Sequence, residues 1–256
     1  MKKIEEENRT IEIVNSSQDI ARRATELFIE TANEAMKKQN SFTVALSGGS
    51  TPKALFELLA LEENASQIDW RRVHIFWSDE RCVPPDNEQS NFRMANEALL
   101  KHVAIPANQI HRMHGEDEPQ IAATNYEREL IKHFGNDEPR FDLILLGMGD
   151  DGHTASLFPN TTAIDETEKL VAAPFVEKFN SYRVTFTFKT INAAKKILFL
   201  VTGASKAETL KKVLSEPRKD LPASLVNPSN GELTWLVDEH AGNAVILAAT
   251  PGTPSS

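Results

Sequence analysis

The chain has 256 residues, with 28 Lys and Arg against 37 Asp and Glu, so its formal net charge at neutral pH is −9. This acidic balance argues against a nucleic-acid-binding surface, because phosphate backbones are met by basic patches. The single cysteine excludes an internal disulfide and a cysteine-ligated zinc site. The apolar runs are too short to cross a bilayer and the first residues carry no apolar signal segment, so we expect a cytoplasmic protein without membrane contact.

Short apolar runs alternate along the chain with stretches in which apolar residues recur at helical spacing. In chain order, we expect a helix over 17–38, a strand over 42–46, a helix over 52–61, a strand over 73–77, helices over 90–100 and 119–134, strands over 141–146, 183–188 and 196–202, and a helix over 205–214. Ser17 is a candidate N-cap of the first helix, and Pro52 suits the first position of the second.

Continuous rather than alternating apolarity predicts strands that are covered on both faces, and the strand–turn–helix order predicts βαβ units. We therefore expect an α/β fold with a mostly parallel, doubly wound sheet flanked by helices, with room for a small subdomain inserted near the middle. Residues 183–188 alternate between polar and apolar, which predicts an edge or antiparallel strand. The whole chain, 1–256, is interpreted as a single catalytic domain in which residues 1–15 and 250–256 are peripheral.

The glycines are concentrated in two turns. Of 11 glycines, five fall in two short segments that each follow a strand-like run, namely Gly48, Gly49, Gly147, Gly149 and Gly152. Glycine lets the backbone approach a ligand, and open α/β sheets bind ligands in the turns that follow strands. Both turns are therefore candidate parts of one binding site.

The first turn, Ser47-Gly48-Gly49-Ser50-Thr51, lies between an expected strand and an expected helix. Two glycines free backbone N–H groups to surround an anion, the helix N-terminus adds partial positive charge, and the hydroxyl groups can donate to phosphate oxygens. The pattern is neither a Walker A loop nor a dinucleotide fingerprint, so it implies neither ATP nor NAD. A glycine-rich turn with a hydroxyl cap is the alternative, and we favour anion binding.

Three charged residues, Asp79, Glu80 and Arg81, follow the strand expected at 73–77. The planar guanidinium of an arginine at a strand end can grip a phosphate or a carboxylate. From this triplet alone, a solvated charge cluster is an equal alternative.

The second glycine turn delivers Asp151 and His153, which are two residues apart. Their side chains can meet in a tight turn, where the carboxylate would fix the imidazole tautomer and raise its basicity. Such a histidine can activate water as a general base. The alternative is a structural histidine, a role that we assign instead to the other six, including His111 and His114, whose spacing offers too few ligands for a catalytic metal.

Two further cations could meet an anion. Arg183 lies on the expected alternating strand, and Lys206 follows the strand at 196–202 in the first turn of a helix. A lysine at that position opposes the helix dipole, which an anionic ligand would explain. For each residue taken alone, a structural role is an equal alternative.

Four motifs occur in the order S-G-G-S-T-P, S-D-E-R-C-V-P with S-N downstream, L-L-G-M-G-D-D-G-H-T-A-S-L-F-P, and V-T-G-A-S-K-A. Together they resemble the 6-phosphogluconolactonase family, which is similar in fold to glucosamine-6-phosphate deaminases and, more remotely, to ribose-5-phosphate isomerases. The resemblance covers residues 16–238, and the ordered set is more specific than any of its members.

The resemblance implies hydrolysis of 6-phospho-D-glucono-1,5-lactone to 6-phospho-D-gluconate in the oxidative pentose phosphate pathway, with His153 as the base and Asp151 beside it. The residues expected to bind phosphate and substrate are Ser47, Gly48, Gly49, Ser50, Thr51, Asp79, Arg81, Gly147, Gly149, Arg183 and Lys206. No metal and no organic cofactor are implied. The expected partner is the small sugar-phosphate lactone, with no nucleic acid and no membrane, and the expected state is a monomer.

Two alternatives remain. A glucosamine-6-phosphate deaminase/isomerase needs further acid–base groups, and where the deaminase pattern has N-E-P this chain has L-F-P, so Phe158 replaces a proton-transferring Glu. A non-catalytic sugar-phosphate sensor would bind without turnover beside a DNA-reading domain, and the first 40 residues show no basic region of that kind. We therefore expect lactone hydrolysis.

Overall fold

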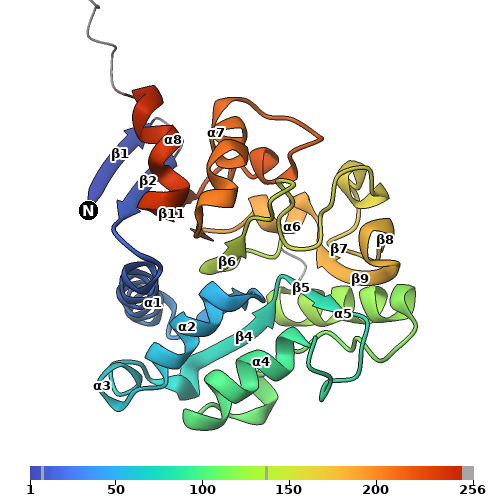
Figure 1. The fold of residues 1–256 in the computed structure, drawn as a ribbon. Helices are drawn as coiled ribbons and strands as arrows, with labels where there is room; N and C mark the ends of the chain where they lie inside the picture. The colour runs from blue at the N-terminus through green and yellow to red at the C-terminus, as the bar shows by residue number, and fades with distance from the viewer. Residues whose placement is uncertain (7–8, 136–137, 250–256) are drawn as a thin grey trace, which may run out of the picture.

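A seven-stranded sheet forms the centre of the computed structural model, which describes residues 1–6, 9–135 and 138–249 (Figure 1). The strands are β1 Lys2–Glu6, β2 Arg9–Val14, β3 Phe42–Leu46, β4 Val73–Trp77, β6 Leu143–Gly147, β10 Lys196–Val201 and β11 Glu232–Asp238. Their order is β1-β2-β11-β10-β6-β3-β4, and every neighbouring pair is parallel except β1 and β2. The expected mostly parallel α/β sheet is confirmed.

Helices cover both faces of this sheet, because successive strand residues bury their side chains on opposite faces. On β3, Val44 and Leu46 belong to one apolar core and Ala45 to the other. The first core packs against α1 Ser17–Gln39, α2 Ser50–Leu59 and α4 Asn91–Ala98. The second packs against α5 Pro119–Phe134, α6 Phe188–Asn192, α7 Ala207–Ser215 and α8 Glu239–Ala249. A single turn, α3 Glu62–Ala65, precedes β4.

A small antiparallel sheet packs against the second core. Its strands are β5 Asp79–Arg81, β7 Val171–Ala172, β8 Phe175–Val176 and β9 Ser181–Phe186. The order is β5-β9-β7, with β8 also paired to β9. The expected antiparallel strand is therefore confirmed as β9, whereas the edge alternative is wrong because β9 lies between two partners. The sheet combines two separate stretches of the chain rather than one continuous insertion.

The N-terminal ends of α1 and α2 differ from the sequence expectation. Ser16, rather than Ser17, caps α1, because its hydroxyl accepts a hydrogen bond from the N–H of Asp19 at 3.2 Å. Helix α2 begins two residues before Pro52, because Gly49 adopts a φ of +110° and turns the chain immediately ahead of the helix.

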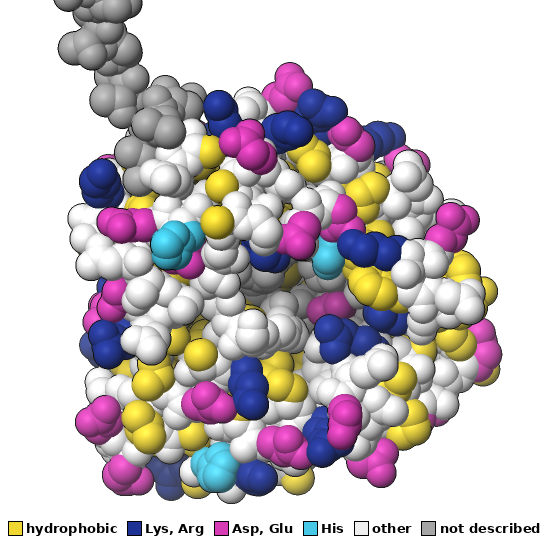
Figure 2. Space-filling model, in the orientation of Figure 1, with side chains coloured by type: hydrophobic (Ala, Val, Ile, Leu, Met, Phe, Trp, Pro, Cys, Tyr) yellow, Lys and Arg dark blue, Asp and Glu magenta, His cyan; other side chains and the backbone are white. Residues whose placement is uncertain are grey.

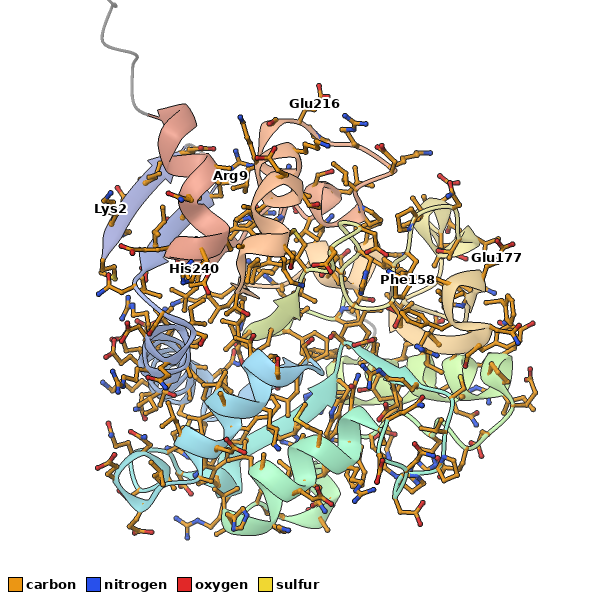
Figure 3. All side chains as sticks on the ribbon, viewed as in Figure 1. Lys2, Arg9, Phe158, Glu177, Glu216 and His240 are labelled. Atoms are coloured by element: carbon orange, nitrogen blue, oxygen red, sulfur yellow. The ribbon has the colours of Figure 1, made fainter. Side chains whose placement is uncertain are left out.

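The N-terminal segment that was expected to be peripheral contains two strands of the central sheet, the edge strand β1 and its neighbour β2. Strand β2 pairs with β11, and its Ile11 and Ile13 are buried in the second core. Arg9 donates to the carbonyl of Leu214 in α7 (Figure 3). The expectation is therefore wrong for residues 9–14, and the other peripheral segment, 250–256, lies outside the described residues. No helix in the described part of the chain is long and apolar enough to cross a membrane.

The buried position of Ile13 provides a test of this arrangement. Ile13→Ala should lower the free energy of unfolding by about 2–5 kcal/mol, because it removes buried methyl groups and leaves a cavity. Ile4→Ala, the same change on edge strand β1, should cost markedly less because Ile4 is only partly buried. Urea unfolding followed by circular dichroism measures both, and equal losses would contradict the burial of β2.

Candidate active site

The loops that follow β3 and β6 diverge at the carboxyl edge of the central sheet. β3 and β6 are neighbours in the sheet. The chain continues from β3 to β4 on one side of this pair, and from β6 to β10 on the other side. Doubly wound folds bind ligands at such a topological switch point. Here it holds a cavity of about 270 Å³. Figure 2 shows this face hollowed near its centre, with Lys and Arg side chains beside the hollow.

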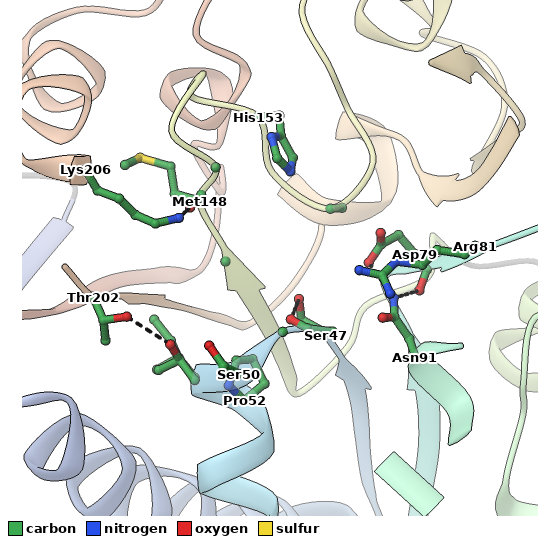
Figure 4. A pocket seen from close by; sticks show the side chains of 17 residues that line it. Ser47, Ser50, Pro52, Asp79, Arg81, Asn91, Met148, His153, Thr202 and Lys206 are labelled. Atoms are coloured by element: carbon green, nitrogen blue, oxygen red, sulfur yellow. Dashed lines mark hydrogen bonds between the residues drawn. The ribbon is translucent and has the colours of Figure 1, made fainter. Parts of the chain in front are cut away.

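Loops from five parts of the chain line the cavity (Figure 4). The lining residues are Ser47, Gly48, Gly49, Ser50, Thr51, Pro52, Asp79, Arg81, Asn91, Gly147, Met148, Gly149, His153, Ala155, Leu200, Thr202 and Lys206. Every site residue that the sequence indicates lies in this wall except Asp151, which contacts His153, and Arg183. The structure therefore brings together segments that the sequence presents separately.

The loop between β3 and α2 forms one wall. A Cβ on Gly48 would overlap the side-chain oxygen of Asn91, so only glycine lets this loop approach α4 so closely. Thr51 Oγ1 lies 3.1 Å from Thr202 Oγ1, which ties the loop to the end of β10. Because α2 begins here, its first turn presents N–H groups that have no acceptor within the helix. The wall is suited to an anion such as phosphate.

His153 and Asp151 stand across the cavity from this loop. His153 Nδ1 lies 2.5 Å from Asp151 Oδ1, and Lys178 Nζ lies 2.8 Å from Asp151 Oδ2. The hydrogen bond with His153, followed by that with Lys178, holds the pKa of Asp151 well below its usual range. An ionised carboxylate only accepts, so the His153 Nδ1 carries the proton and Nε2 is left as the basic nitrogen.

Two neighbours fix the orientation of the His153 imidazole. A Cβ on Gly149 would overlap the ring, so the ring packs directly on the glycine backbone. The Phe158 ring stacks on the His153 ring, with the ring centroids 3.9 Å apart and an interplanar angle of 25°. Phe158 is only 5% exposed, so its neighbours hold its ring in place beside His153. A phenyl ring is apolar and cannot transfer a proton.

Asp79 and Glu80, adjacent in sequence, do different things. Asp79 lines the cavity, and its carboxylate accepts a hydrogen bond from Ser156 Oγ at 2.7 Å. Glu80 is 2% exposed and holds the start of α4 against β5. Its carboxylate accepts hydrogen bonds from Ser90 Oγ and from the N–H groups of Arg81, Asn91 and Phe92. Burial raises the pKa of Glu80, and the bonds from these N–H groups act against that rise. A solvated charge cluster is therefore the wrong interpretation of these carboxylates.

Cations stand on two sides of the cavity (Figure 4). Lys206 ends the 3₁₀ turn Ala204–Lys206 ahead of α7 and donates to the Met148 carbonyl. Arg81, on the other side, donates to the Gln89 carbonyl. Lysine has three donors and arginine five, so both retain donors for a ligand.

Arg183 stands behind Arg81 rather than in the cavity wall. The two residues are cross-strand partners on β5 and β9. The Arg183 guanidinium donates to the Tyr182 carbonyl at 2.9 Å and lies 5.2 Å from the ring centroid of Phe179. Burial, and next the charge of Arg81, lower the pKa of Arg183. Two neighbouring guanidinium groups repel each other, so a bound anion would stabilise the pair.

Three contributors were not singled out as site residues from the sequence. Asn91 and Thr202 line the cavity, and Lys178 holds Asp151. Asn91 and Thr202 carry a local signal, because each lies at the end of an expected element. Lys178 carries none, because it is 27 residues from Asp151 in the chain.

A doubly wound α/β fold that places a loop suited to an anion and a carboxylate-supported histidine in one switch-point cavity is typical of enzymes for small anionic substrates. The chain belongs to the family described as glucosamine-6-phosphate isomerases/6-phosphogluconolactonase, whose model matches residues 15–235.

Similar proteins include several lactonases. The 6-phosphogluconolactonase of Nostoc sp. is 41% identical over 240 residues, covering 91% of this chain and 97% of the relative. That of Haemophilus influenzae is 44% identical over 200 residues, covering 77% and 85%. The solved 6-phosphogluconolactonase from Trypanosoma brucei has a TM-score of 0.83 at 28% identity, covering 92% and 98%. A monomeric glucosamine-6-phosphate deaminase shares the fold, with a TM-score of 0.78 at 20% identity, covering 91% and 99%.

The buried carboxylate of Glu80 can be tested by an isosteric change. Glu80→Gln should lower the free energy of unfolding by about 1–3 kcal/mol, because an amide NH₂ group would face N–H donors in a buried place. The exposed change Glu88→Gln in the same loop region should have little effect. Chemical unfolding of both variants gives the comparison. An unchanged free energy of unfolding for Glu80→Gln would show that these hydrogen bonds do not stabilise the contact between β5 and the start of α4.

Proposed function

We propose that this protein hydrolyses 6-phospho-D-glucono-1,5-lactone to 6-phospho-D-gluconate, the lactone step of the oxidative pentose phosphate pathway. The observation that carries the proposal is the placement of His153, paired with Asp151, in the same cavity as the loop between β3 and α2. The family, and relatives named as lactonases at 41% and 44% identity, support the same reaction.

The proposed reaction needs one base. His153 Nε2 removes a proton from water while the water oxygen bonds to the lactone carbonyl carbon. The tetrahedral intermediate then breaks the bond between that carbon and the ring oxygen, and the imidazolium returns the proton to the ring oxygen. Asp151 stabilises the imidazolium between the two steps and holds the ring in place. Water supplies all the atoms that are added, so no organic cofactor takes part.

We assign the 6-phosphate to the loop between β3 and α2 and to the cations beside it. The residues are Ser47, Gly48 and Gly49 in the loop and Ser50 and Thr51 in the first turn of α2. The cations are Lys206 and Arg81, with Arg183 behind Arg81. Because the net charge of −9 repels a phosphate, this local cluster has to provide the attraction. Asp79, Gly147 and Gly149 line the remainder, where the sugar ring would lie.

The second candidate, a glucosamine-6-phosphate deaminase, is less well supported. A deaminase has to open a sugar ring, move a proton between carbons and release ammonia, so it needs more acid–base groups than a lactonase. Phe158, stacked on His153, offers no proton. The apolar ring leaves His153 suited to the simpler hydrolysis.

Loss of the base tests the mechanism. His153→Ala should lower kcat by about 10²–10⁴-fold and leave KM within a few-fold, because the imidazole acts in the transition state. His114→Ala, the same change at an exposed histidine, is the control and should keep the wild-type rate. Rates are measured on fresh lactone after subtraction of spontaneous hydrolysis. If His153→Ala keeps more than half of the wild-type kcat, His153 is not the base. If the wild-type protein binds the lactone without hydrolysing it, the sensor alternative is favoured.

Parallel assays on one sample separate the two enzymes. The protein should open 6-phosphogluconolactone rapidly and release no detectable ammonia from glucosamine 6-phosphate. Both compounds carry a 6-phosphate, so the residues assigned to the phosphate can hold either one. The difference has to come from the groups that transfer protons near C1 and C2. Ammonia release at a rate comparable to lactone opening would overturn the proposal. An equal kcat/KM for unphosphorylated gluconolactone would remove the phosphate assignment while leaving the hydrolysis.

We also propose that the whole chain forms one catalytic domain and that the protein is a monomer in the cytoplasm. Its partner is the small sugar-phosphate lactone, and it binds neither nucleic acid nor membrane. The acidic net charge supports the absence of a nucleic-acid partner. A single cysteine suits a reducing compartment, where disulfides do not persist.

A further inference from the structure

A second cluster of chemically active side chains lies at the opposite edge of the central sheet. His74 is the second residue of β4, His111 follows the 3₁₀ turn Ala107–Gln109, and His133 is in the last turn of α5. One ring nitrogen from each lies within 4.8 Å of the other two. His133 also contacts Thr43, the second residue of β3, so the cluster is at the amino ends of these parallel strands. The candidate active site is at their carboxyl ends.

Hydrogen bonds orient the rings of this cluster. His74 Nδ1 lies 3.2 Å from His111 Nε2, and His111 Nδ1 lies 2.9 Å from Glu129 Oε1. The carboxylate accepts, so His111 Nδ1 carries a proton and Nε2 directs its lone pair toward His74. A histidine whose far nitrogen is held by a carboxylate is the usual form of a metal ligand.

The packing keeps the three rings close and favours their neutral form. Phe76 stacks on His111 with centroids 4.2 Å apart and meets His133 edge-on at 5.1 Å. Burial lowers the pKa of all three histidines, that of His133 to about 4. The charged groups that face them are Glu129 and Lys132. Neutral imidazole is the form that ligates metals, and burial favours that form.

We propose that His74, His111 and His133 bind one divalent transition-metal ion of the zinc type. The Glu129 carboxylate orients His111 by accepting the hydrogen bond from its Nδ1, which leaves Nε2 for the metal. Tetrahedral zinc, with Zn–N distances of about 2.0–2.1 Å, needs ligand nitrogens roughly 3.4 Å apart. The 3.2 Å between His74 Nδ1 and His111 Nε2 meets that requirement. The His133 nitrogen lies within 4.8 Å of both and would have to move closer for one ion to bind all three. Imidazole selects zinc, copper and nickel over Mg²⁺ and Ca²⁺, which take oxygen ligands.

The surroundings fit this occupant. Coordination through His74 Nδ1 moves its proton to Nε2, which lies 3.4 Å from the Gln109 amide, and that amide can turn its oxygen to accept it. His111, Glu129 and Lys132 also line a cavity of about 790 Å³, which offers a path from solvent. The ion would join β4, the segment that carries His111, and α5 at three points, so its binding should stabilise the fold.

Zinc titration of the full-length protein tests the proposal. After treatment with a chelator, the protein should bind one equivalent of Zn²⁺ at pH 7, measured by competition with a chromophoric chelator, and no Mg²⁺. Glu129→Gln should weaken binding by about 10–100-fold, as loss of an outer carboxylate does, and His133→Gln by at least as much. The controls are Glu127→Gln on the same helix and His114→Gln on the same cavity wall, which should bind as the wild type does.

A second readout separates a metal site from a structural histidine cluster. Zinc should raise the thermal midpoint of the wild type and leave that of His133→Gln unchanged, with circular dichroism showing that the variant is folded. Absence of binding by the wild type would overturn the proposal, as would binding that Glu129→Gln and His133→Gln leave unchanged. Loss of binding in His153→Ala would also overturn it, because the zinc would then sit in the candidate active site.

Discussion

The divergence of two neighbouring parallel strands is the constraint on which the rest of this structure depends. Strands β3 and β6 lie side by side, yet the chain continues from them toward opposite edges of the sheet. A gap therefore opens at their carboxyl ends, where the two glycine turns lie. One loop leads into a helix N-terminus and suits an anion, and the other delivers an imidazole. The binding and the chemistry that we propose are thus assigned to two loops whose separation is set by the sheet.

Close packing, rather than flexibility, explains two of the glycines in the gap. Gly48 leaves room for the Asn91 side chain, and Gly149 leaves room for the His153 ring. With Phe158 stacked on the imidazole and a carboxylate on Nδ1, the His153 ring has little freedom to turn away. Such preorganisation suits the proposed role as a single general base, because little reorganisation would be needed during the reaction.

The electrostatics of the two edges of the sheet differ. At the carboxyl edge, an acidic protein gathers Lys206, Arg81 and Arg183 around one cavity, so local charge opposes the net charge of −9. At the amino edge, burial lowers the pKa of His74 and His133, which pack against each other, with Phe76 beside His133. One edge is therefore suited to an anion, and the other to a cation that binds neutral nitrogen.

Local patterns were sufficient for the elements and motifs whose determinants lie close together in the chain. Strands β3 and β4 and helix α5 have the predicted bounds, because apolar spacing and turn residues are local signals. Asp151 and His153 were paired correctly because only one residue, Gly152, separates them in the chain. The sheet order instead determines that β2 pairs with β11, that Arg183 lies behind Arg81, and that three distant histidines meet. Such contacts join segments far apart in the chain, and a one-dimensional pattern does not encode which strands become neighbours.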